Sequence, residues 1–135
     1  MKIREILERI PFQCLQGSLD GEITGYCHDN RQVKPGDMFI CIKGARFDTH
    51  DCVEDVAKKG ARMIVVQKPV AVLADVTVIL VEDTRRASAF LAAAFYGHPA
   101  ERMTVVGVTG SKGKTTVTHM LADILRAFGR QVGTL

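Results

Sequence analysis

The chain has 135 residues, of which 47% are hydrophobic and 24% charged, and its formal net charge is +3. These values are typical of a folded globular protein and argue against a disordered chain, and no apolar run approaches the roughly 18–20 residues that cross a bilayer. The basic residues are scattered and aromatic residues are few, so we expect no nucleic-acid partner, although a mildly positive surface suits phosphate-bearing ligands.

The N-terminus mixes charged and apolar side chains instead of forming the separate apolar segment of a signal peptide, so we expect a cytoplasmic protein. The four cysteines are Cys14, Cys27, Cys41 and Cys52, and no two of them form a C-x-x-C pair. They lie among apolar or strand-like neighbours. We therefore expect buried free thiols rather than a metal site or disulfides.

Helical and strand-like patterns alternate through residues 1–100. Apolar residues at i, i+3, i+4 and i+7 predict helices, and short apolar or β-branched runs predict strands. The expected helices are residues 3–10, 52–59 and 85–96, and the expected strands are residues 23–27, 38–42, 63–66 and 76–81. Pro11 ends the first helix, Gly60 ends the second, and Gly97-His98-Pro99 breaks the third. The turn Lys34-Pro35-Gly36-Asp37 separates the first two strands.

The end of the chain repeats this alternation around a glycine-rich loop. Residues 103–108 are an expected strand, residues 114–128 are an expected helix that Gly129 ends, and residues 131–135 begin another strand. One strand, one helix and the start of another strand cannot form a sheet that is covered on both faces. We therefore expect the chain to be the front part of a longer protein.

These elements predict an α/β protein with two parts. A small N-terminal α/β domain is expected over residues 1–100, and the first, incomplete βαβ unit of a second domain over residues 101–135. The alanine-rich helix of the first domain is expected to pack in the core, with Phe90 and Phe95 as its larger apolar contacts.

The glycine-rich loop, residues 107–116, has the sequence GVTGSKGKTT. A strand that leads into such a turn and then a helix presents several backbone N–H groups and the positive end of the helix dipole to one point, which favours phosphate binding. Lys114 is the candidate catalytic residue because its ammonium can reach terminal phosphates, and the Thr115 hydroxyl can ligate Mg²⁺. The expected nucleotide-binding residues are Gly110, Ser111, Lys112, Gly113, Lys114, Thr115 and Thr116. Val108 stands where the general G-x-x-x-x-G-K-[ST] pattern has its first glycine, so a plain glycine turn is the alternative.

The loop resembles the ATP-binding motif of the Mur ligases, whose glycine spacing has the same offset, and stretches upstream agree with that family. Residues 29–39 are similar to its D-S-R-x-V-x-P-G-D-x-F signature. Residues 43–50 are similar to the K-G-x-x-x-D-G-H loop that follows, with Thr49 in place of the frequent glycine, which predicts a different φ at that turn. Residues 82–85 and 95–99 also match. The last stretch is most similar to the family member that adds a diamino acid, and the member that adds D-alanyl-D-alanine is the alternative.

The resemblance implies an ATP- and Mg²⁺-dependent ligase of peptidoglycan precursor synthesis. Its small-molecule substrates would be UDP-MurNAc-L-Ala-D-Glu, whose D-glutamate carboxylate is activated as an acyl phosphate, and a diamino acid, either meso-diaminopimelate or L-lysine. The first domain would bind UDP and the second would begin the central ATP-binding domain. The residues implied at the UDP site are His28, Asn30, Ala45, Arg46 and Phe47, with Phe47 stacking and Arg46 near the diphosphate. We expect a monomer, and this fragment is expected to be inactive alone.

Several polar residues have a structural interpretation of equal or greater weight. Asp29 and Arg31 form either an ion pair that fixes the turn or direct ligand contacts. His98 is expected to pack as a linker residue, and His119 to face solvent or a neighbouring domain. Two functions of other classes stay open: a UDP-nucleotide binding module without catalysis, and an unrelated P-loop kinase, which would leave the first domain unexplained.

Overall fold

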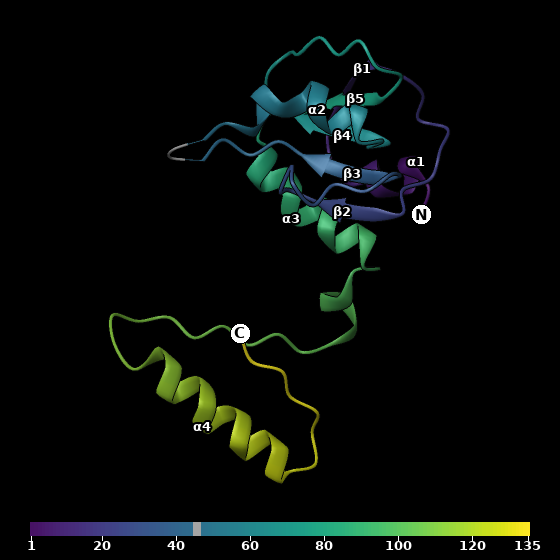
Figure 1. Cartoon of the computed structure of the whole chain (residues 1–135). Helices are drawn as coiled ribbons and strands as arrows, with labels where there is room; N and C mark the ends of the chain where they lie inside the picture. Colours follow the sequence, from purple (N-terminus) through teal and green to yellow (C-terminus); the bar gives the residue numbers. More distant parts are fainter. Residues whose placement is uncertain (45–46) are drawn as a thin grey trace. The chain divides into compact units, whose positions relative to one another are not determined.

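The computed structural model describes residues 1–44 and 47–135. The chain forms two compact units, Met1–Pro99 and Ala100–Leu135. The first unit is built on a five-stranded sheet in the order β1-β5-β4-β3-β2 (Figure 1). The strands are β1 (Gln13–Gln16), β2 (Gly25–Cys27), β3 (Asp37–Ile40), β4 (Met63–Val66) and β5 (Thr77–Leu80). β2, β3, β4 and β5 run parallel to one another and β1 pairs antiparallel with β5, so four carboxyl ends meet at one edge of the sheet. The expected α/β fold class is confirmed.

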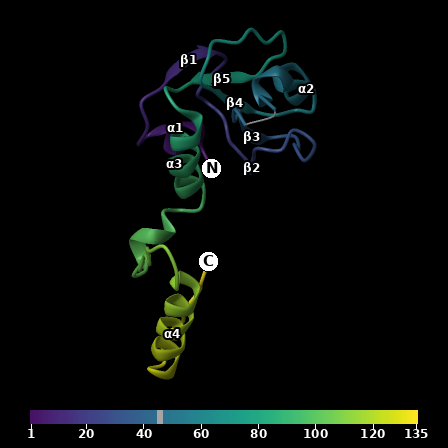
Figure 2. The same ribbon diagram turned by 90° about the vertical axis from the view of Figure 1, so that its left-hand side faces the viewer.

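Helices cover both faces of this sheet. α1 (Ile3–Leu7) and α3 (Thr84–Phe95) lie on one face and α2 (Val53–Lys58) lies on the other (Figure 2). Successive residues of a strand point to opposite faces, so Met38 and Ile40 pack with α1 and α3, whereas Phe39 packs in the cluster that contains Val56 of α2. β3 and β4 are buried at every position, because a parallel sheet between two helical layers has no solvent-facing side.

Local sequence sets where these helices begin and end. The Asp83 carboxylate caps α3, because it accepts hydrogen bonds from the N–H groups of Arg85 at 2.8 Å and Arg86 at 3.1 Å. α2 is followed by Gly60, whose φ of +91° favours glycine and whose N–H donates to the Ala57 carbonyl at 2.9 Å. The expected helix end at Gly60 is confirmed.

Three expectations for the first unit need correction. The sequence does not predict β1, because its residues Q-C-L-Q have no apolar alternation, and the strand has only β5 as a neighbour. Cys41 is fully buried as expected, but Cys14 in β1 is exposed, so the expectation of four buried thiols is wrong. Phe95 packs against the core as expected, but Phe90 is 45% exposed, and the fully buried Leu91 is the other large side chain by which α3 contacts the core.

The second unit follows a short 3₁₀ turn, η2 (Pro99–Arg102), and contains α4 (Lys114–Ala127) as expected. The strands expected at residues 103–108 and 131–135 are absent from this unit, all of which the structure describes. A strand needs a partner for its N–H and C=O groups, and no described segment pairs with residues 103–108, where Val105 is 69% exposed. Neither α4 nor any other described helix is long and apolar enough to span a membrane.

Candidate functional site

The glycine loop leads directly into α4 and leaves the first turn of that helix open. Gly113 is the N-cap, with a φ of +78° that favours glycine, and it offers no side-chain oxygen to the helix. The bond from Val117 N–H to the Gly113 carbonyl, at 3.0 Å, closes the first turn and leaves the preceding N–H groups without intrahelical partners. A β-carbon added at Gly113 would meet no atom within 4 Å. An anion can therefore approach these N–H groups at the positive end of the α4 dipole.

Lys114 is the first residue of α4, and its side chain folds back over the glycine loop. Its Nζ donates a hydrogen bond to the Gly110 carbonyl at 2.8 Å, so the ammonium is held beside the glycine segment. Thr115 and Thr116 are exposed in the first turn of α4. One short segment thus combines an ammonium, two hydroxyls and backbone N–H groups. This combination suits a phosphate group with a bound divalent cation.

The residues expected around uridine follow the carboxyl ends of β2 and β3, which lie at the same edge of the parallel sheet. His28 follows β2 directly and is exposed, with its ring centroid 6.4 Å from that of Tyr26. Asn30 Nδ2 donates to Cys52 Sγ at 3.7 Å, and Cys52 belongs to the 3₁₀ turn η1 (Thr49–Cys52). The structure therefore brings the segment after β2 against the segment that follows residues 43–48.

Two residues predicted at the UDP site, Ala45 and Arg46, lie outside the described residues. Phe47 is described and is 56% exposed, so a planar ligand can reach its ring. Thr49, which replaces the frequent glycine of the family pattern, has ordinary backbone, since His98 is the only described non-glycine residue with a positive φ.

Asp29 and Arg31 form the ion pair of the structural interpretation. Arg31 donates from Nε and Nη2 to the two carboxylate oxygens at 2.9 and 2.8 Å, its backbone N–H donates at 3.0 Å, and Gln32 adds a further bond at 3.0 Å. The Arg31 side chain, followed by its backbone N–H and the Gln32 amide, holds the pKa of Asp29 well below its ordinary value. This pair fixes the turn that follows His28.

The P-G-D part of the same signature builds a second turn. Asp37 is 6% exposed, its Oδ2 accepts from the Lys34 N–H at 2.9 Å, and its own N–H donates to the Lys34 carbonyl at 3.1 Å. Asp37 begins β3, so this turn lies at the amino end of the parallel strands. The signature over residues 29–39 therefore contains one part at each end of the sheet.

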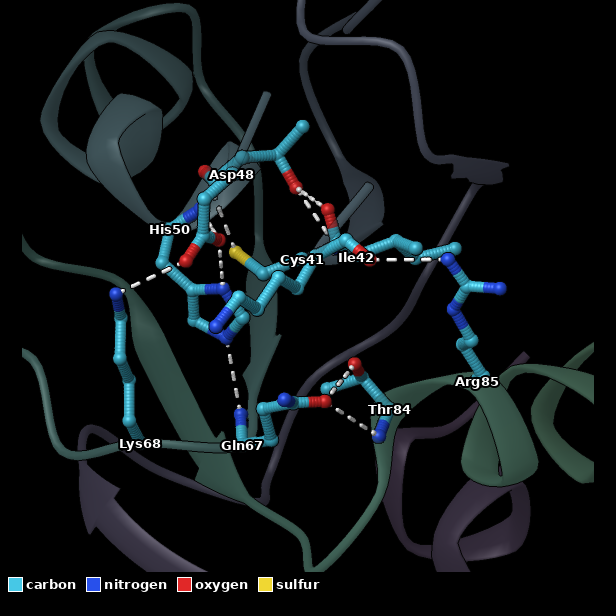
Figure 3. A network of polar contacts seen from close by, with 10 residues as sticks. Cys41, Ile42, Asp48, His50, Gln67, Lys68, Thr84 and Arg85 are labelled. Atoms are coloured by element: carbon cyan, nitrogen blue, oxygen red, sulfur yellow. Dashed lines mark hydrogen bonds and ion pairs between the residues drawn. The ribbon is translucent and has the colours of Figure 1, made fainter. Parts of the chain in front are cut away.

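A polar cluster at the carboxyl edge was not predicted from the sequence. His50 of η1 is 3% exposed and is hydrogen-bonded to Asp48 and to the backbone of Gln67, while Lys68 pairs with Asp48 at 3.0 Å (Figure 3). Asp48 and His50 belong to a stretch that the family resemblance singles out. Gln67 and Lys68 carry no such signal, because they follow β4 and approach the others only in the folded chain.

A cleft of about 750 Å³ lies along the edge strand β2. Its described lining includes the aromatic rings of Tyr26, Phe95 and Tyr96 and the cationic side chains of Arg31 and Lys34. Its lining also includes Cys27 and Arg31, which flank the predicted uridine residues His28 and Asn30 in sequence, although neither of those two described residues lines the cleft.

The two units define an α/β protein in which a unit with a mainly parallel sheet precedes a glycine-rich loop that opens a helix. Residues 22–96 match the family described as "Mur ligase family, catalytic domain", and residues 108–135 match the "Mur ligase middle domain". The chain belongs to the Mur ligase family, as the sequence predicts.

Relatives named UDP-N-acetylmuramoyl-L-alanyl-D-glutamate--2,6-diaminopimelate ligase align with nearly all of the chain. The protein of this name from Geobacillus thermodenitrificans is 40% identical over 135 residues, which are 100% of this chain and 27% of the relative. The one from Lactiplantibacillus plantarum is 44% identical over 128 residues, which are 93% of this chain and 26% of the relative. The chain thus spans about a quarter of the length of these curated relatives.

Two solved structures show the same similarity in three dimensions. MurF from Acinetobacter baumannii superposes with a TM-score of 0.65 at 31% identity, over 93% of this chain and 27% of that chain. MurF from Thermotoga maritima, solved in complex with ADP, gives a TM-score of 0.60 at 34% identity, over 76% of this chain and 23% of that chain.

Proposed function

We propose that the parent protein is an ATP-dependent ligase of peptidoglycan precursor synthesis that joins a diamino acid to UDP-MurNAc-L-Ala-D-Glu. The observation that carries this proposal is the alignment of nearly the whole chain with ligases of that name, at 33% to 44% identity. 2,6-Diaminopimelate is the first amino acid to test because those relatives are named for it, and L-lysine is the second. The monomeric state, the cytoplasmic location and the inactivity of the fragment alone stay predictions.

In this proposal the domain expected to start at residue 101 begins the ATP-binding domain, over residues 101–135. ATP supplies the phosphoryl group that turns the D-glutamate carboxylate into an acyl phosphate, which the amine can attack. Residues Gly110–Thr116 hold its phosphates through backbone N–H groups, and the Lys114 ammonium stabilises negative charge on them. The Thr115 hydroxyl is the proposed ligand for Mg²⁺, which supplies Lewis-acid stabilisation at the same phosphates. The open first turn of α4 and the exposure of the loop fit this role.

The N-terminal domain expected over residues 1–100 is the proposed UDP-binding domain. His28, Asn30 and Phe47 supply an imidazole, an amide and a ring at the carboxyl edge of the sheet, which suit the hydrogen-bonding edge and the face of a uracil. Ala45 and Arg46 belong to the same loop, and Arg46 is the proposed contact to the diphosphate.

An ADP-release assay on the intact parent protein tests the proposal. We expect ADP only when ATP, Mg²⁺, UDP-MurNAc-L-Ala-D-Glu and a diamino acid are all present, with meso-diaminopimelate and L-lysine assayed separately. Equal ADP release without the UDP substrate or the amino acid would overturn the proposed ligase.

A D-alanyl-D-alanine-adding ligase is the second candidate, because the two solved structures described above are MurF proteins. This candidate predicts ADP release in the same assay when UDP-muramoyl-tripeptide and D-alanyl-D-alanine are the substrates. Calorimetry on the 135-residue chain addresses the third candidate, a binding module without catalysis. Binding of the UDP-muramoyl-dipeptide by this chain without ATP turnover would favour that candidate, and no binding would mean that further domains are required.

A further inference from the structure

His50 is a buried histidine with both ring nitrogens occupied. It is 3% exposed, and its Nε2 lies 3.1 Å from the backbone nitrogen of Gln67. A backbone N–H can only donate, so Nε2 accepts and the ring proton lies on Nδ1, which faces Asp48 Oδ1. The imidazole therefore donates to Asp48 and accepts from Gln67 at the same time (Figure 3). Neither nitrogen is available to a substrate or a metal ion, which excludes a catalytic role in this arrangement.

Asp48 is held as a carboxylate by three donors. It accepts hydrogen bonds from the backbone N–H of His50 at 3.0 Å, from the His50 ring and from Lys68 Nζ at 3.0 Å. These bonds, with the two from His50 first, keep the pKa of Asp48 well below its ordinary value. The side chain is only 21% exposed, so the charge stays paired at the carboxyl edge of the sheet.

Asp48 also closes the loop that contains the proposed uridine residues. Lys43 and Asp48 form an antiparallel bridge, and Gly44 N–H donates to the Phe47 carbonyl at 2.9 Å. We name these four residues, Lys43, Gly44, Phe47 and Asp48, the hairpin stem. Ala45 and Arg46 connect its two sides in sequence.

The hairpin stem is tied to several elements of the first unit. Arg85 of α3 donates from Nη2 to the Lys43 carbonyl at 3.0 Å. On the other side, the ring of His50 links Asp48 to Gln67 after β4, and Gln67 Oε1 accepts from the Thr84 hydroxyl at 2.8 Å at the start of α3. Both sides of the stem are therefore fixed to the same helix, one directly and one through His50.

We infer that His50 is a positioning residue that holds the hairpin stem, and with it Phe47 of the proposed UDP site, at the carboxyl edge of the sheet. The inference rests on the proposed UDP-binding function of Phe47. A loop that is already fixed by buried hydrogen bonds loses little conformational entropy when it binds a ligand. A loop without such bonds must be ordered on binding, which lowers the affinity. Loss of either bond of His50 therefore weakens binding of the UDP substrate and leaves the ATP loop, which lies in the other unit, unaffected.

The test uses the intact parent protein and two substitutions that each keep half of the link. His50→Asn keeps a donor at the position of Nδ1 toward Asp48, and His50→Gln keeps an acceptor at the position of Nε2 toward Gln67. The control is Asp20→Asn, which removes an exposed ion pair with Arg4 elsewhere in the first unit. For each variant, KM for UDP-MurNAc-L-Ala-D-Glu, KM for ATP and kcat are measured, together with the melting temperature.

We expect each His50 substitution to raise KM for the UDP substrate about tenfold, the effect of one lost buried hydrogen bond, with KM for ATP and kcat within about twofold of the parent. A parallel rise of both KM values, or no rise in a protein that melts above the assay temperature, would overturn the inference. If neither His50 variant folds, Asp48→Ala removes the same link from its partly exposed end, and the same two outcomes decide. A parent protein that releases ADP without the UDP substrate would instead refute the proposed function.

Discussion

Replacing Gly25 by alanine should destabilise the first unit through a contact that the backbone cannot avoid. Gly25 of β2 pairs with Asp37 of β3, and a β-carbon added at Gly25 would overlap Asp37 Oδ1 and lie 3.1 Å from its Cγ. Asp37 is almost fully buried and its other oxygen accepts from the Lys34 N–H at 2.9 Å. The carboxylate must therefore rotate away from the methyl group and give up that bond.

The two consequences have similar magnitudes. Overpacking in a well-packed site costs about 1–3 kcal/mol, and loss of a hydrogen bond to a charged group costs about 1.5–3 kcal/mol. Rotation of the Asp37 carboxylate removes the clash but breaks its hydrogen bond to Lys34. Only one of the two costs is therefore incurred, and they do not add. We expect Gly25→Ala to lower the free energy of unfolding by about 2 kcal/mol and the melting temperature by roughly 10 °C.

Urea unfolding followed by tyrosine fluorescence measures this effect selectively, because both tyrosines, Tyr26 and Tyr96, lie in the first unit and the chain has no tryptophan. Gly21→Ala is the control: the three atoms nearest to its added methyl all belong to the Arg62 guanidinium, the far end of a long flexible side chain, so we expect a change below about 0.5 kcal/mol. The decisive variant is the double substitution Gly25→Ala with Asp37→Ala. It should be no less stable than Asp37→Ala alone, and additive losses would refute the steric argument.

Three further predictions concern the ATP loop, the reactivity of the thiols and the loss of folding stability at acid pH. Lys114→Ala in the intact parent should lower kcat on the order of 100-fold, and an unchanged rate of ADP release would remove the ammonium from the proposed site. Burial, aided by the charge of Asp48, raises the pKa of Cys41 to about 12, so at pH 8 a thiol reagent should modify exposed Cys14 rapidly and Cys41 only after urea unfolding. Similar rates for both would contradict this. Asp29 and Asp48 have pKa values below the ordinary 3.8, so their stabilisation is complete above that pH and is lost as the pH falls further. Asp48→Asn should flatten this loss in acid-unfolding curves, and an acid limb as steep as that of the parent would argue against it.

Features encoded over a few neighbouring residues were predictable from the sequence. The apolar run at residues 63–66 is β4 with the same bounds, and the helix expected at residues 114–128 is α4 to within one residue. The β-branched run at residues 103–108 has the composition of a strand, yet a strand exists only where another segment supplies its hydrogen-bond partners. β1 shows the converse, because its polar sequence becomes a strand through pairing with β5, far along the chain.

The same distinction applies to the sites. The glycine loop is continuous in sequence, so its residues were identifiable together, whereas the carboxyl-edge site draws on segments after β2 and β3 and was predicted only through family resemblance. His50 was part of that resemblance, but its role depends on Gln67, a residue whose backbone N–H reaches the ring only after β4 is paired. Periodicity and spacing carry no information about such a contact.

The structure also divides one sequence signature into parts with different physical roles. Asn30 lies at the carboxyl edge, where its amide donates to the polarisable Cys52 sulfur, so we expect its substitution to act mainly on what the edge binds. Asp37, seven positions later in the same signature, is buried at the amino end of β3 and fixes the turn at Lys34. A loss of substrate binding after substitution of Asp37 would therefore report a displaced β2–β3 connection, which moves the edge residues with it, and not a lost contact to the nucleotide.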